Sequence, residues 1–156
     1  MFKLGRPVVD FGLRRTTIVV EQPFHHDREE RMKYLFLAYG DERQLDTMSA
    51  GERDALVSAC LANDEALRQS GHLLAVEGLQ GSGGAITVRV QNGKVRVADG
   101  PFVETKEQLI GVFTINARDL NEAIQVAAMM PQARGGPIEV RPIVGDRAVK
   151  EAPTRT

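Results

Sequence analysis

The sequence is poor in three features that would each assign it to a class of protein. It has a single cysteine, which excludes an internal disulfide framework and any metal site made of cysteines alone. No apolar run approaches the roughly 18 residues that a membrane helix needs. Its 20 Lys and Arg side chains against 21 Asp and Glu give a net charge of -1, without the excess positive charge that captures nucleic acid or anionic membranes. We therefore expect a cytoplasmic protein that binds neither nucleic acid nor membrane.

What is present is an ordinary globular composition, with 42% hydrophobic and 26% charged residues, in a length that suits one domain. The first 31 residues differ from the rest because neither helical nor strand periodicity is sustained there. We expect residues 1–31 to be a poorly ordered extension, or to precede a true start at Met32. Residues 32–146 would form the domain and residues 147–156 a tail. No residues show the spacing of metal ligands or of a nucleotide fingerprint, so we expect neither a metal nor a cofactor.

Local signals place the helices and strands after residue 32. Ser49 and Glu52 form a capping box, which predicts a helix from there to Gly71. A second helix is predicted from Asp119 to Pro131. Asn92-Gly93 fits a type I′ turn and predicts a hairpin of residues 85–90 with 94–97. Further strands are predicted at 34–39, 72–79, 109–115 and 138–144, and a flexible connector at 81–84.

Apolar residues at helical spacing predict the buried face of each helix. In the first helix this stripe consists of Leu56, Ala59, Cys60 and Leu67. Because it lies on the stripe, Cys60 is interpreted as a small buried side chain. In the second helix the predicted stripe consists of Leu120, Ala123, Ile124 and Ala127.

The order of elements predicts the fold class. With the hairpin set aside, the order is β-α-β-β-α-β, the ferredoxin-like α+β plan with both helices on one face of an antiparallel sheet. The strands at 34–39 and 109–115 carry apolar residues on both faces, whereas the helices can cover only one face. We expect a second copy of the chain to cover the other face, and so predict a homodimer.

The most distinctive segment for chemistry is Asp99-Gly100-Pro101-Phe102. Pro101 restricts its own φ and biases Gly100 away from the right-handed helical region, which makes a stiff corner. In one interpretation Asp99 is a general acid or base, and Phe102 forms a wall of a pocket. In the other, Asp99 only caps its own backbone amides in a turn, as Asp before Gly commonly does. Spacing alone favours the turn.

Other polar residues are candidate ligand contacts. Glu139 and Arg141 lie two apart on a strand and therefore share a face. They form a solvated pair if that face is open, and need each other or a ligand if it is covered. Arg134, before two glycines, could bind a carboxylate or phosphate, or lie in a plain loop that follows a helix. The remaining candidates are Tyr39, Glu77, Glu104 and Lys106.

Several separated motifs resemble the YCII-related family, in the branch named for an Asp-Gly-Pro-Phe motif. These motifs are Met32-Lys33-Tyr34-Leu35, Tyr39-Gly40-Asp41-Glu42, Gly78-Leu79, the run from Asp99 to Leu109, Ala133-Arg134-Gly135-Gly136 and Ile138-Glu139-Val140-Arg141-Pro142. The resemblance implies a ferredoxin-like fold that forms a dimeric α+β barrel, in bacterial proteins of unestablished function. Some members are encoded beside extracytoplasmic-function sigma factors. A histidine–aspartate pair has been proposed as catalytic in the wider family, but the helix at 52–69 has no histidine and His72 lies beyond it.

Two functions follow from these observations. The first is a small-molecule enzyme or binder with Asp99 as acid or base, whose pocket lies between helices and sheet or at the dimer seam. The second is a non-enzymatic regulatory dimer, acting with a sigma factor, in which the same motifs hold the fold together. A ligand that stabilises the protein less in Asp99→Ala would favour the first function.

Overall fold

The computed structural model describes residues 31–145, so all but the last residue of the predicted extension at 1–31, and the predicted tail at 147–156, lie outside the described residues. The elements follow in chain order: β1 (Met32–Gly40), α1 (Glu42–Thr47), α2 (Ala50–Gln69), β2 (Leu73–Gly78), the 3-10 turn η1 (Ser82–Gly84), β3 (Ile86–Gln91), β4 (Lys94–Asp99), β5 (Gln108–Ala117), α3 (Leu120–Met129), the 3-10 turn η2 (Pro131–Arg134) and β6 (Ile138–Pro142).

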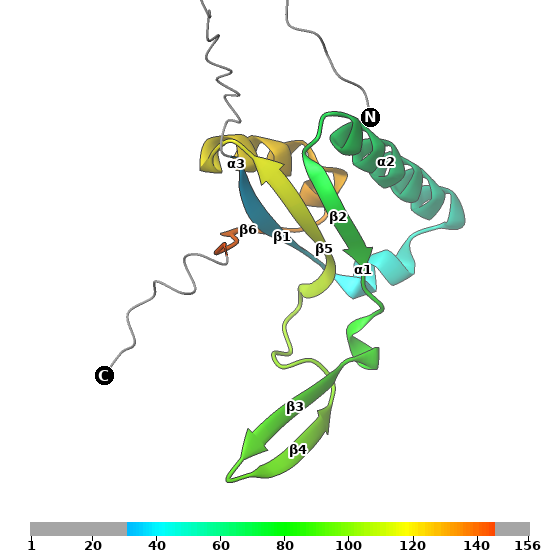
Figure 1. Ribbon diagram of the computed structural model, residues 1–156. Helices are drawn as coiled ribbons and strands as arrows, with labels where there is room; N and C mark the ends of the chain where they lie inside the picture. Colours follow the sequence, from blue (N-terminus) through cyan, green and yellow to red (C-terminus); the bar gives the residue numbers. More distant parts are fainter. Residues whose placement is uncertain (1–30, 146–156) are drawn as a thin grey trace, which may run out of the picture.

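Four strands form an antiparallel sheet in the order β2-β5-β1-β6, and α2 and α3 lie on one face of it (Figure 1). This mixed α+β arrangement is consistent with the predicted ferredoxin-like plan. The strands β3 and β4 pair with each other in a separate two-stranded sheet, as the predicted hairpin. Asn92 and Gly93 at its tip have φ values of 51° and 71°, the positive values that the predicted type I′ turn requires.

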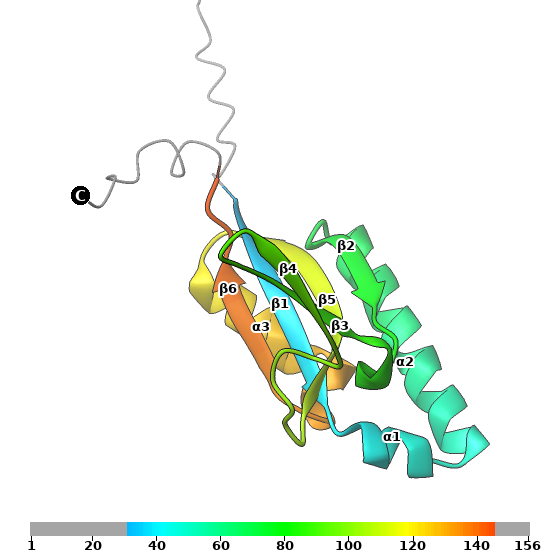
Figure 2. The ribbon, with the colours of Figure 1, turned by 90° about the horizontal axis from the view of Figure 1, so that it is seen from below.

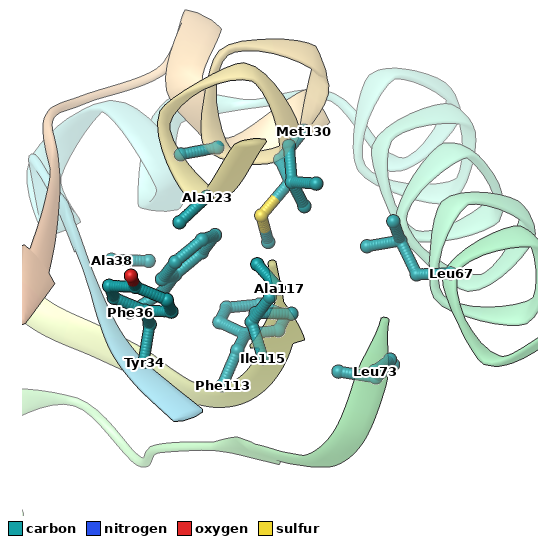
Figure 3. Packing of buried hydrophobic residues seen from close by; sticks show 12 residues of the cluster. Tyr34, Phe36, Ala38, Leu67, Leu73, Phe113, Ile115, Ala117, Ala123 and Met130 are labelled. Atoms are coloured by element: carbon teal, nitrogen blue, oxygen red, sulfur yellow. The ribbon is translucent and has the colours of Figure 1, made fainter. Parts of the chain in front are cut away.

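Alternation along β1 and β5 gives the sheet two different faces. The face toward the helices carries the core, with Phe36 and Ile115 each 0% exposed. Figure 3 shows Phe36, Phe113 and Met130 in the space beneath α3. The intervening side chains lie on the opposite face and are half-buried in the single chain: Leu35, Leu37, Tyr39, Val112 and Thr114. We call this the open face of the sheet. The prediction of apolar residues on both faces is confirmed.

Both long helices begin and end where local signals placed them. The hydroxyl of Ser49 accepts from the N–H of Glu52 at 3.3 Å, and the carboxylate of Glu52 accepts from the N–H of Ser49 at 2.9 Å, which completes the capping box of α2. Asp119 caps α3 by accepting from the N–H of Glu122 at 2.8 Å. Pro131 follows the end of α3, as predicted.

The buried faces of these helices differ in part from the predicted stripes. In α2, Leu67 is buried and Cys60 is half-buried, but Ala59 is exposed. In α3, Val126 is buried beside the alanines of the stripe, whereas Leu120 and Ile124 are 48% and 49% exposed. Spacing by three and four residues allows several adjacent stripes on one helix. The buried stripe of α3 consists of Ala123, Val126 and Ala127, so the helix turns its smaller side chains toward the sheet.

An unexpected carboxylate lies on the buried side of α2. Asp64 is only 7% exposed, and its Oδ1 has no hydrogen-bond partner among the described residues. The neighbouring contact is a hydrogen bond from Nε2 of Gln132 to Sγ of Cys60 at 3.4 Å. Burial raises the pKa of the Asp64 carboxyl above its ordinary value of 3.8, because the charged form loses solvation.

This shift predicts a pH dependence of stability. Between the pKa of Asp64 in the unfolded chain and its higher pKa in the folded chain, folding takes up a proton at this carboxyl. The contribution of Asp64 to the free energy of unfolding therefore falls as the pH rises through that range. We expect the stability of the wild type relative to Asp64→Asn to decrease as the pH rises above the ordinary Asp pKa of 3.8. Urea unfolding at a series of pH values measures this, with the exposed Asp54→Asn on the same helix as control. A difference that stays constant with pH would contradict the prediction.

Candidate functional site

Two segments that are distant in the sequence meet where β1 ends and β5 begins. Gly40 pairs with Gln108, so the turn into α1 lies beside the loop that enters β5. Together with η1, these segments surround an open pocket of about 490 Å³. Its lining consists of Asp41, Glu42, Arg43, Ser82, Gly83, Gly100, Pro101, Glu104, Thr105, Lys106 and Gln108.

The first wall of the pocket is α1, a helix that the sequence analysis missed. Asp41 is its N-cap, and the carboxylate accepts from the N–H of Arg43 at 3.1 Å. With only six residues and no buried side chain, α1 lacks the apolar stripe by which longer helices are detected. The Asp at the cap was the one local signal available.

The second wall is η1, in the segment predicted to be a flexible connector. Glu42 holds this turn to α1, because its carboxylate accepts from both the N–H and the hydroxyl of Ser82, each at 2.6 Å. The hydroxyl first and then the N–H stabilise the charged form, so they lower the pKa of Glu42 below its ordinary value. The connector is therefore fixed by a contact between residues forty positions apart.

The third wall is the loop from Gly100 to Gln108, which supplies Glu104 and Lys106. Nζ of Lys106 lies 3.7 Å from Oδ2 of Asp41, although the Lys106 side chain is 79% exposed. Within residues 31–145, the side chains of Arg43 and Glu104 form no hydrogen bond or ion pair. The pocket therefore holds one cation and one carboxylate that are free to bind a ligand.

Asp99 lies outside this pocket, at the exposed end of β4 and one residue before the lining Gly100. Backbone groups hold the corner: the N–H of Gly100 donates to the carbonyl of Ala85 at 2.7 Å, and the hydroxyl of Thr87 donates to the carbonyl of Gly100 at 2.9 Å. Gly100 has a φ of 97°, which a residue with a side chain rarely adopts. The Asp99 carboxylate forms no hydrogen bond within the described part of the chain, so its interpretation as a capping group is wrong.

Three other predicted residues are separate from the pocket lining. Phe102 is 71% exposed, and the guanidinium of Arg89 lies 4.8 Å from its ring centroid in a cation–π contact. Glu77 is exposed on β2, opposite Val112 of β5. Arg134 is exposed in η2. Of the predicted set, the pocket therefore includes only Glu104 and Lys106.

The structure brings Tyr39, Glu139 and Arg141 together on the open face. The Tyr39 hydroxyl donates to Oε2 of Glu139 at 3.3 Å. Nε of Arg141 donates to Oε1 of Glu139 at 2.7 Å, and Nη2 of Arg141 forms an ion pair with the same oxygen at 2.6 Å. Burial, and then the Glu139 carboxylate, raise the pKa of Tyr39. The shared face of Glu139 and Arg141 is confirmed, and in the single chain they form a solvated pair worth less than about 1 kcal/mol.

His72 has partners that sequence reasoning did not find. Its Nδ1 lies 2.8 Å from the hydroxyl of Ser70, and its Nε2 lies 3.6 Å from Oε1 of Glu122. The N–H of Arg118 also donates to Glu122, and this is the largest cause that lowers the pKa of that carboxyl. Among residues 31–145, no three His, Cys, Asp or Glu side chains are placed to hold a metal ion, and no helix is long and apolar enough to cross a membrane.

An antiparallel sheet with both long helices on one face places the protein in the α+β class, consistent with the ferredoxin-like plan. The chain belongs to the YCII-related domain family, whose model matches residues 32–145. It is 35% identical over 114 residues to an uncharacterized protein of Rhizobium meliloti (strain 1021), an alignment that covers 72% of this chain and 92% of that protein. The predicted resemblance to the YCII-related family is confirmed.

Proposed function

We propose that this protein binds a small metabolite carrying an acidic group, in the pocket between α1 and the Gly100–Gln108 loop. The convergence of these two segments on one pocket carries the proposal. A volume of about 490 Å³ suits a small molecule. Asp41 already faces Lys106, and Glu42 is satisfied by Ser82.

The two unengaged side chains define the ligand chemistry. The guanidinium of Arg43 presents a planar fork of donors that matches a carboxylate or a phosphate. Glu104 is an acceptor for a hydroxyl or an ammonium group on the same molecule. For a ligand that is turned over and extends from the pocket to the end of β4, we assign the acid or base to Asp99, an exposed residue that directly precedes the lining Gly100.

Binding is tested by thermal shift of the full chain with inorganic phosphate, hydroxy acids, amino acids and sugar phosphates. A ligand at about 100 times its Kd should stabilise the protein by about 2.7 kcal/mol. We expect Arg43→Ala to abolish this shift and Arg68→Ala, an exposed arginine of α2, to retain it. Retention of the shift in Arg43→Ala would overturn the proposed pocket.

Asp99→Asn separates binding from chemistry. The amide keeps the size of the side chain but cannot exchange a proton at neutral pH, so we expect the thermal shift to persist and turnover of the identified ligand to be lost. If no ligand in the panel stabilises the folded protein, the regulatory alternative, with a sigma factor as partner, becomes the better proposal.

We further propose that the protein is a homodimer in which a second copy covers the open face. The half-buried Leu35, Leu37 and Val112 gain burial there, and a two-fold axis repeats each contact. Light scattering at micromolar concentration should give twice the chain mass of 17.1 kDa. A mass of one chain would contradict the dimer.

A further inference from the structure

We infer that the hairpin of β3 and β4, here called the arm, packs its apolar side on the open face of a second copy of this chain. The inference rests on the proposed dimer and names the element that forms its contact. The arm is a two-stranded sheet that stands apart from the rest of the domain, and it belongs neither to the pocket nor to the core.

One side of the arm is almost wholly apolar and exposed. Val88 pairs with Val97 and Val90 with Val95, so these four side chains lie together with Ile86. In the single chain they are 59% to 68% exposed: Ile86, Val88, Val90, Val95 and Val97. An isolated two-stranded hairpin is at best marginally stable in water. The arm therefore needs a surface to cover this side.

The open face is a suitable surface, and it belongs to the same chain. Figure 1 shows the arm extending on the side of the sheet away from α2 and α3. In the view from below, β3 and β4 lie in front of β1 and β5, so the arm projects from the side of the open face (Figure 2). The arm remains exposed beside its own sheet, whereas a second copy offers an uncovered sheet to each arm. A two-fold axis satisfies both arms at once.

The arm and the rest of the described chain carry net charges of opposite sign. The arm, residues 86–99, carries three cations, Arg89, Lys94 and Arg96, and one carboxylate, Asp99. The rest of residues 31–145 carries nine Lys and Arg against thirteen Asp and Glu. A net cationic arm is attracted to the net anionic remainder of another copy, which favours a second copy as the partner.

The first test is the oligomeric state of the full chain with the paired substitution Val90→Lys and Val95→Lys. Both side chains are exposed in the single chain, so their replacement leaves the core intact, and far-UV circular dichroism checks this. We expect the variant to be monomeric by light scattering. Leu61→Lys, which changes a leucine of α2 that is 64% exposed, should remain dimeric.

The outcomes separate the two proposals. If the wild type and the variant with Val90→Lys and Val95→Lys are both dimeric, the arm contact is wrong and the proposed dimer is supported. A monomeric wild type would overturn both. If Leu61→Lys is monomeric and the arm variant is dimeric, the interface lies on α2 and the inference is wrong.

A photo-cross-link identifies the surface that the arm contacts. A benzophenone side chain at position 90, in a mixture of isotopically light and heavy chains, should yield mixed-isotope peptides that join the arm to β1 or β5. Links within one chain, links to residues 1–30 or links between two arms would each overturn the inference.

Discussion

Gly136→Ala is expected to destabilise the protein by about 3 kcal/mol, because a new methyl group would have to displace backbone. A Cβ at Gly136 would overlap the carbonyl oxygen of Tyr39 and lie 2.9 Å from the Tyr39 carbonyl carbon. The next residue, Pro137, accepts a hydrogen bond from the N–H of Tyr39 at 3.0 Å. The segment that precedes β6 can therefore approach β1 this closely only because Gly136 has no side chain.

The adjacent glycine is the matched control for this prediction. A Cβ at Gly135 would meet only the carbonyl oxygen of Gln132 at 3.8 Å, and the φ of Gly135 is −96°, which any residue adopts. We expect Gly135→Ala to leave the free energy of unfolding within about 0.5 kcal/mol of the wild type. Urea unfolding compares the two variants, and an equal loss in both would show that the packing against Tyr39 is not the cause.

Phe36→Ala is expected to cost about 3–5 kcal/mol, a large part of the roughly 5–15 kcal/mol that stabilises a typical domain. Phe36 is 0% exposed in the middle of β1, between the sheet and α3 (Figure 3). Its removal leaves a cavity whose lining, including Phe113, is fixed by the pairing of β1 with β5. The surrounding residues can fill such a cavity only in part. The loss of stability therefore includes both the lost burial of the phenyl ring and the cost of the cavity that remains.

Phe102→Ala makes the same chemical change at a side chain that is 71% exposed. The main loss there is the cation–π contact with Arg89, so we expect a cost below about 1 kcal/mol. Denaturant unfolding of the two variants under one set of conditions gives the comparison. Similar costs for Phe36→Ala and Phe102→Ala would contradict the assignment of the core to the helix-facing side of the sheet.

Most of the fold could be predicted because its signals are local. The capping box of Ser49 and Glu52 and the Asn92-Gly93 turn each act within a few residues, and both were found in the expected places. The failures included α1, which is too short to show a stripe, and the choice of Val126 over Ile124 on the buried face of α3. Which side chains of α3 are buried depends on the shape of the sheet surface beneath the helix, and the spacing of apolar residues along the helix carries no information about that surface.

The site was less predictable. The loop residues Glu104 and Lys106 were expected to contact a ligand and do line the pocket, but Arg43 and Ser82 gave no signal of their own. Glu139 and Arg141 were correctly placed on one face because the two-residue period of a strand is local. Their partner Tyr39 lies on β1 and approaches them only because β1 pairs with β6.

The sequence by itself determined where the two long helices, the hairpin and most strands lie, and that the sheet is apolar on both faces. Capping, turn formation and alternation are decided by interactions between residues close together in the chain. Only the tertiary structure decided that Glu42 anchors Ser82, that Arg43 lines one pocket together with the loop after Pro101, and that the arm stands free. These placements follow from the register of β1 against β5, which joins segments about seventy residues apart and results from packing the whole core at once.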